Sequence, residues 1–176
     1  MIADWSPLWL SLRVALAVSV LALGIAPWPA WWLARRNLAG VTLLTRFLSM
    51  APAVIVAALA APAFAWPVAV AAGLVRAVAY TLPECRAAFE RLNPGYVKAA
   101  RMVGASDWRI FRTVALPLEG GAALAAAADV FAETLLEMAV ALWILGRLSA
   151  APASAIVVTS LAAGALGLWL RREAVR

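Results

Sequence analysis

The chain has 176 residues, of which 66% are hydrophobic and only 14% are charged, and its net charge is +6. Soluble domains usually contain about 45–50% apolar and about 25% charged residues, so this composition is typical of a protein embedded in lipid. The absence of histidine and the single cysteine, Cys85, exclude histidine-based catalysis, histidine metal sites and a disulfide within the chain. Neither a GxSxG nor an HExxH motif occurs, so we expect no enzyme and no metal site.

The first half of the chain predicts three transmembrane helices, at residues 8–33, 41–64 and 68–89. Each run is long enough to cross a bilayer, for which roughly 20 apolar residues suffice. Several tryptophans near the end of the first run, followed by Arg35 and Arg36, are typical of a lipid–water boundary. Prolines interrupt the second run, which lipid tolerates only where neighbouring helices satisfy the freed backbone groups.

Residues 93–117 form the one long polar and positively charged passage of the chain. Asn93 and the proline after it predict a helix start, since asparagine caps helices and proline fits the first helical position. Gly104 fits a left-handed helix end, and Ser106 or Asp107 can cap a second short helix. We therefore expect two short helices that meet at a glycine and lie at a membrane surface.

The residues alone leave the role of this passage open. An amphipathic loop held by lipid headgroups is the simplest interpretation. Two short helices with a glycine turn are also similar to a helix-turn-helix that binds DNA. The flanking membrane spans argue against a nucleic-acid partner, because such a reader has to reach the major groove.

The passage resembles the EAA loop, a cytoplasmic segment in the permease subunits of binding-protein-dependent ABC importers. The pattern of that family is Glu-Ala-Ala, three residues, Gly, nine residues, Ile, any residue, and Leu-Pro. Val114 replaces the isoleucine, and Lys98 stands where the family usually has glutamate. The remaining positions match at the correct spacing: Ala99, Ala100, Gly104, Leu116 and Pro117.

The resemblance implies partners and a place for ATP hydrolysis. In that family the loop forms coupling helices that sit in a groove of a separate ATP-binding subunit, which also binds the ATP and Mg²⁺. The chain itself would then need no cofactor. An ATPase dimer offers two grooves, so a second permease copy or a similar subunit is implied, unless the chain is half of a fused permease. An extracytoplasmic substrate-binding protein is implied as well. ATPase coupling is thereby assigned to Lys98, Ala99, Ala100, Gly104, Ala105, Leu116 and Pro117.

Two further spans are predicted at residues 117–145 and 152–170. Residues 1–176 thus predict a single all-α domain, a polytopic membrane helix bundle of about five transmembrane helices with a cytoplasmic coupling-helix loop. Arginine and lysine collect on one side of such a bundle, whereas the other side has only Arg147. In the inner membrane of a bacterium, the positive-inside rule then places the N-terminus outside, and the 93–117 loop and the C-terminus in the cytoplasm.

Three acidic residues, Asp129, Glu133 and Glu137, fall at four-residue intervals in the fourth span and so share one helix face. Charged side chains in lipid face the bundle interior and have partners. From estimated depths we expect Arg76 to pair with Asp129 and Arg13 with Glu137, which would leave Glu133 to face a translocation path. Alternatively, the acids only hold the helices together.

Three functions therefore stay open. The first is an importer permease, and the others are a degenerate or non-transporting scaffold subunit and an intramembrane enzyme. An acidic stripe along a path favours a cation such as thiamine or iron(III) over an oxyanion such as molybdate. The first span, at Ser11-Leu12-Arg13 and Gly24, is similar to permeases of the molybdate, iron(III) and thiamine branch.

Overall fold

The computed structural model describes residues 5–36, 40–41, 43–45, 66–144 and 150–175. The regular structure within these ranges is helical, with no strand, which confirms the predicted all-α class. In chain order the elements are α1 (Ser6–Ile25), α2 (Pro27–Leu33), α5 (Trp66–Arg91), α6 (Pro94–Met102), α7 (Asp107–Ile110), the π-helical turn η2 (Phe111–Ala115), α8 (Leu116–Ile144) and α9 (Ala150–Val175).

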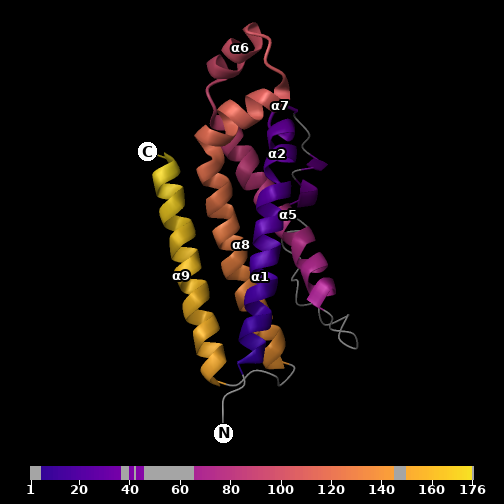
Figure 1. The fold of residues 1–176 in the computed structure, drawn as a ribbon, viewed down its shortest axis with the longest axis vertical. Helices are drawn as coiled ribbons and strands as arrows, with labels where there is room; N and C mark the ends of the chain where they lie inside the picture. The colour runs from indigo at the N-terminus through magenta and orange to yellow at the C-terminus, as the bar shows by residue number, and fades with distance from the viewer. Residues whose placement is uncertain (1–4, 37–39, 42, 46–65, 145–149, 176) are drawn as a thin grey trace.

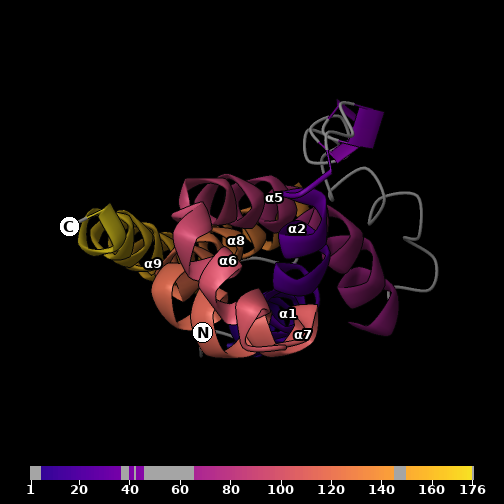
Figure 2. The ribbon, with the colours of Figure 1, turned by 90° about the horizontal axis from the view of Figure 1, so that it is seen from above.

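Four long helices, α1, α5, α8 and α9, run side by side, and α6 and α7 cap one end of them (Figure 1). α8 is the central helix, because it packs against α1, α5 and α9. Figure 2 shows α9 at one flank of α8, and α1, α2 and α5 on its other side. α1 begins at the end opposite to α6, whereas α9 runs back toward the α6 end (Figure 1).

The predicted span 8–33 forms two helices that are nearly continuous. Ala26, between α1 and α2, keeps helical dihedrals, and its N–H donates to the carbonyl of Ala22 at 2.8 Å. The helical hydrogen bonds continue where Ala30 donates to Ala26 at 3.0 Å. The two prolines of α2 lack an N–H, which explains why the interruption falls there.

Two helices of the described residues, Leu8–Leu33 and Ala153–Glu173, are apolar and long enough to cross a membrane by length and composition. α5 and α8 have the length, but they carry the ionisable residues described below. The predicted span 41–64 lies almost entirely outside the described residues. The number of five spans therefore stays a prediction.

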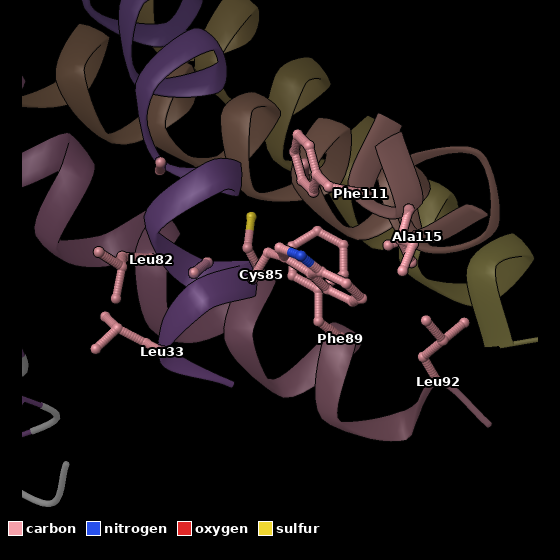
Figure 3. Close-up of a cluster of buried hydrophobic side chains, with 12 residues drawn as sticks. Leu33, Leu82, Cys85, Phe89, Leu92, Phe111 and Ala115 are labelled. Carbon is pink, nitrogen blue, oxygen red and sulfur yellow. The ribbon is translucent and has the colours of Figure 1, made fainter. Parts of the chain in front are cut away.

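A buried apolar cluster holds together the end of the bundle that carries α6 and α7. Figure 3 shows its side chains from α2, α5 and the π-helical turn, among them Leu33, Leu82, Cys85, Phe89, Leu92, Phe111 and Ala115. The ring of Phe89 lies edge-on to Trp31 at 5.6 Å and to Phe111 at 6.0 Å. Such aromatic pairs contribute about 0.5–1.5 kcal/mol each beyond their buried area. The cluster gives the short helices a rigid base.

Candidate functional site: the 93–117 loop and the charged clusters

The start of α6 follows from its sequence. The side chain of Asn93 caps the helix, because its Oδ1 accepts a hydrogen bond from the N–H of Gly95 at 2.8 Å. Pro94 occupies the first helical position, where its missing N–H costs nothing. Both features agree with the prediction from the sequence.

Gly104 ends α6 with a φ of +78°, the only positive φ among the described residues. Its N–H donates to the carbonyl of Arg101 at 2.9 Å, and the N–H of Ala105 donates to that of Ala100 at 3.1 Å. This pair of bonds is a Schellman motif, which requires a left-handed residue at the position of Gly104. The conformation explains why glycine stands here.

α7 begins at Asp107, and the residue that caps it is Ser106. The Oγ of Ser106 accepts a hydrogen bond from the N–H of Arg109 at 3.3 Å. Asp107, the other candidate, instead accepts from two guanidinium groups, those of Arg35 at 3.0 Å and Arg101 at 3.1 Å. We call these three residues the Asp107 clamp. It joins the end of α2 to both short helices.

The clamp also affects the acidity of its carboxyl group. The hydrogen bond from Arg101 is the largest cause that holds the pKa of Asp107 below its usual value, and the positive charge of Arg35 adds to it. Partial desolvation acts in the opposite direction but is outweighed. Asp107 is therefore charged at neutral pH, and the clamp is formed.

The positions that match the EAA pattern divide between two faces of α6. Ala100 packs against the buried cluster, together with Val97. Lys98 and Ala99 are exposed, and no residue of α6 is fully buried. Beyond them Met102 is 82% exposed and Val103 is 83% exposed, so the end of α6 presents two apolar side chains outward. α6 thus presents its outer face and its tip away from the bundle (Figure 1).

The end of the loop contains a feature that the sequence did not predict, a π-helical turn over Phe111–Ala115. The N–H of Leu116 donates to the carbonyl of Phe111, five residues earlier. Leu116 packs against the buried cluster, and Pro117 is exposed in the first turn of α8. Single π-helical turns are rare and often occur at functional sites.

The acidic residues of α8 have other partners than those predicted. Arg76 on α5 contacts Glu133 at 2.6 Å and Glu137 at 2.7 Å, through different nitrogens of one guanidinium group. The predicted pairs Arg76–Asp129 and Arg13–Glu137 are therefore wrong, and Arg13 is exposed on α1. Glu133, which was expected to face a path, is paired, although 41% of its side chain remains exposed.

The stagger of the antiparallel helices α5 and α8 explains this correction. Arg76 lies ten residues after Trp66, or about 15 Å along α5. Glu133 and Glu137 lie eleven and seven residues before Ile144, or about 16 and 10 Å from the same end of the bundle. Asp129 lies fifteen residues before Ile144, or about 22 Å from that end of the bundle. The guanidinium group therefore meets the two glutamates, which are one helical turn apart, rather than Asp129.

Asp129 pairs with Arg171 of α9 at 2.5 Å, a contact that the sequence analysis missed. The same guanidinium donates to the hydroxyl of Tyr80 at 3.3 Å and lies 3.6 Å from Glu84, both on α5. Four side chains thus join α5, α8 and α9. Arg171 directly follows the predicted last span, residues 152–170, and was not considered as a partner. One feature of the sequence could have indicated this contact: a glycine four residues before Arg171, which lies on the same face of α9.

That glycine, Gly167, brings α9 into close contact with α8. A methyl group at this position would lie 2.3 Å from Oδ1 of Asp129 and 3.3 Å from the carbonyl oxygen of Ala125. Small residues allow such close helix approach in membranes. The close contact places Arg171, one turn further along α9, beside the same carboxylate.

Comparisons with known proteins identify the family of the chain. Residues 30–170 match the model of a family described as "Binding-protein-dependent transport system inner membrane component". The chain is also 30% identical over 149 residues to the "Molybdenum transport system permease protein ModB" of Haemophilus influenzae. That match covers 72% of this chain and 65% of the relative, so the chain spans less than two thirds of the relative's length. The predicted family is confirmed, and the chain belongs to the family of binding-protein-dependent transport system inner membrane components.

Proposed function

We propose that the chain is the permease subunit of an ABC importer and that its 93–117 loop couples the membrane helices to a separate ATPase. The observation that carries this proposal is the elbow of α6 and α7. Its Schellman turn at Gly104 and its clamp at Asp107 give it a defined shape, and its outer face is exposed. A rigid, uncovered element at the end of a helix bundle can transmit the motion of a docked partner as a rigid-body rotation.

The proposed topology places the N-terminus outside and the loop in the cytoplasm of a bacterial cell. The directions of two helices support it, since α1 begins opposite the loop and α9 runs toward the loop end (Figure 1). The loop end also carries most of the positive charge of the described residues, which the positive-inside rule assigns to the cytoplasm. ATP is available only on that side.

The proposal includes three kinds of partner. An ATPase dimer would bind ATP and Mg²⁺ and receive the loop, with Lys98 and Ala99 on the contact face. A second copy of this chain, or a similar subunit, would complete the translocation path. A substrate-binding protein would deliver the substrate to the opposite end of the bundle.

We propose an oxyanion such as molybdate as the substrate. The similarity to a molybdenum transport permease supports this class. The earlier preference for a cation depended on an acidic stripe with one unpaired member. Each of the three carboxylates now has an arginine partner, so that argument has lost its basis.

The first experiment is co-purification of this chain with the ATP-binding subunit of its proposed importer. We expect wild type to co-purify and Gly104→Trp to fail, because a residue with a bulky side chain is strained in the left-handed backbone conformation of this turn. The matched control is Gly24→Trp, since Gly24 lies in α1 with open space around it. If Gly104→Trp binds as well as the control does, the loop is not the coupling element.

Uptake separates transport from a scaffold role. Cells that depend on this gene product are given radiolabelled molybdate, and thiamine in a parallel experiment. Molybdate uptake that requires the chain supports the proposed substrate. A complex that assembles normally while neither substrate depends on the chain would favour a non-transporting scaffold.

A further inference from the structure

A cavity of about 460 Å³ lies between α6 and the neighbouring ends of α2 and α5. Its size is within the usual range of small-ligand pockets, about 300–1,000 Å³. The coupling contacts proposed above use the outer face of α6, and of the residues named for them Lys98 also lines this cavity. Its lining residues are Trp31, Ala34, Arg35, Phe89, Glu90, Leu92, Pro94, Val97, Lys98 and Arg101.

The charges around the cavity favour an anion. Arg35, Lys98 and Arg101 contribute three positive charges, and Glu90 is the one acid of the lining, so the sum is +2. Glu90 is already paired with Arg86 at 2.7 Å. The two arginines donate to Asp107, but a guanidinium group has five N–H donors and keeps others for a ligand.

The wall of the cavity adds an apolar surface. Trp31 is only 3% exposed and its indole N–H is buried, so this residue contributes the apolar part of its ring to the wall. The guanidinium carbon of Arg35 lies 3.6 Å from the centre of the Trp31 ring, which holds the cation in place beside the cavity.

We propose that this cavity binds a phosphate ester, and that the source is the headgroup of an anionic phospholipid. A phosphate diester offers acceptor oxygens to the cationic donors, and the acyl chains of the lipid can lie along the apolar wall. Basic pockets at the cytoplasmic ends of membrane helices are known to accept such headgroups. The lipid source rests on the proposed topology, whereas the phosphate chemistry rests on the cavity alone. The bound group would bridge α6 to α2 and α5, and so brace the coupling helix against the bundle.

The test is ligand binding by the full chain, purified in dodecylmaltoside without any partner. The midpoint of heat-induced aggregation is measured while dioleoylphosphatidylglycerol, dioleoylphosphatidylcholine or glycerol 3-phosphate is titrated. We expect the anionic lipid to raise the midpoint and the neutral lipid to have little effect. Stabilisation by glycerol 3-phosphate at similar concentrations would support the phosphate site and assign it to a soluble ester.

Two variants and one control decide whether the effect arises in the cavity. We expect Lys98→Gln to weaken the apparent affinity about tenfold, which corresponds to about 1.4 kcal/mol. Arg101→Gln removes a second cationic lining residue, and it should weaken binding in the same direction. Arg109→Gln removes an exposed charge from the same loop outside the cavity lining and should bind as wild type does.

Equal affinities for Lys98→Gln and Arg109→Gln would overturn the proposal, as would equal stabilisation by the two lipids. Both results are independent of the ATPase, so a failure here leaves the coupling proposal standing. Conversely, the cavity can bind its ligand even if the loop does not couple to an ATPase.

Discussion

Substitution of Gly167 by alanine tests the contact between α8 and α9 most directly. The added methyl group would lie 2.3 Å from Oδ1 of Asp129, 3.2 Å from its Cγ and 3.3 Å from the backbone oxygen of Ala125. The carboxylate has to move, or the two helices have to separate. Either shift weakens the contact of Asp129 with Arg171, which joins three helices.

The size of the effect follows from opposing contributions. Overpacking of a close helix contact costs about 1–3 kcal/mol. Removal of one partner from a buried ion pair costs about 3–5 kcal/mol. Here the carboxylate of Asp129 is only displaced, so the cost is a part of that value. The higher helix propensity of alanine offsets about 1 kcal/mol. When the two destabilising contributions and the propensity gain are combined, we expect Gly167→Ala to lower the free energy of unfolding by about 1–3 kcal/mol.

Gly164 provides the matched control on the same helix. A methyl group there would lie 4.0 Å from Cβ of Ala132, an ordinary contact, so Gly164→Ala should be neutral or slightly stabilising. The assay is reversible unfolding in mixed micelles with increasing sodium dodecyl sulfate. Gly167→Ala should cost less in an Asp129→Ala background than in wild type, because the contact with the carboxylate is gone and only that with the Ala125 oxygen remains. Equal stabilities of the two single glycine variants would refute the argument.

Three further predictions concern the loop and the charged clusters. Gly104→Ala should destabilise α6 by about 1–2 kcal/mol through its left-handed backbone, measured by hydrogen exchange of the loop amides. Asp107 has a lowered pKa, so its clamp should be present above the ordinary aspartate pKa of about 3.9 and lost as the pH falls further. Asp107→Asn should remove this pH dependence from the amide exchange of α7. At neutral pH the same variant should lower the stability of the loop by less than about 1 kcal/mol, because the pair is exposed. Arg76→Gln should destabilise the bundle by about 3–5 kcal/mol, since it leaves two carboxylates one turn apart. Glu133→Gln should destabilise the bundle less than Arg76→Gln does, because Arg76 keeps one acidic partner. Unfolding of both variants in mixed micelles tests this order of stabilities.

Features that depend on a few neighbouring residues could be predicted from the sequence. The cap at Asn93 and the glycine turn at Gly104 require only residues within one helical turn. The family of the chain could also be predicted, because the spacing between Gly104 and Leu116-Pro117 is visible in the sequence. The π-helical turn before Pro117 was not, since its residues are compatible with an ordinary α-helix.

The ion pairs between helices were decided by the tertiary structure alone. The sequence determined that Asp129, Glu133 and Glu137 share one face of a helix, but not which of them meets Arg76. Partner choice depends on the stagger of two helices, and one turn of about 5.4 Å exchanges one acid for the next. The ends of predicted spans are uncertain by a similar length. In the structure, the close contact at Gly167 brings α9 to α8 and places Arg171 beside Asp129, and this contact between distant residues cannot be inferred from local sequence.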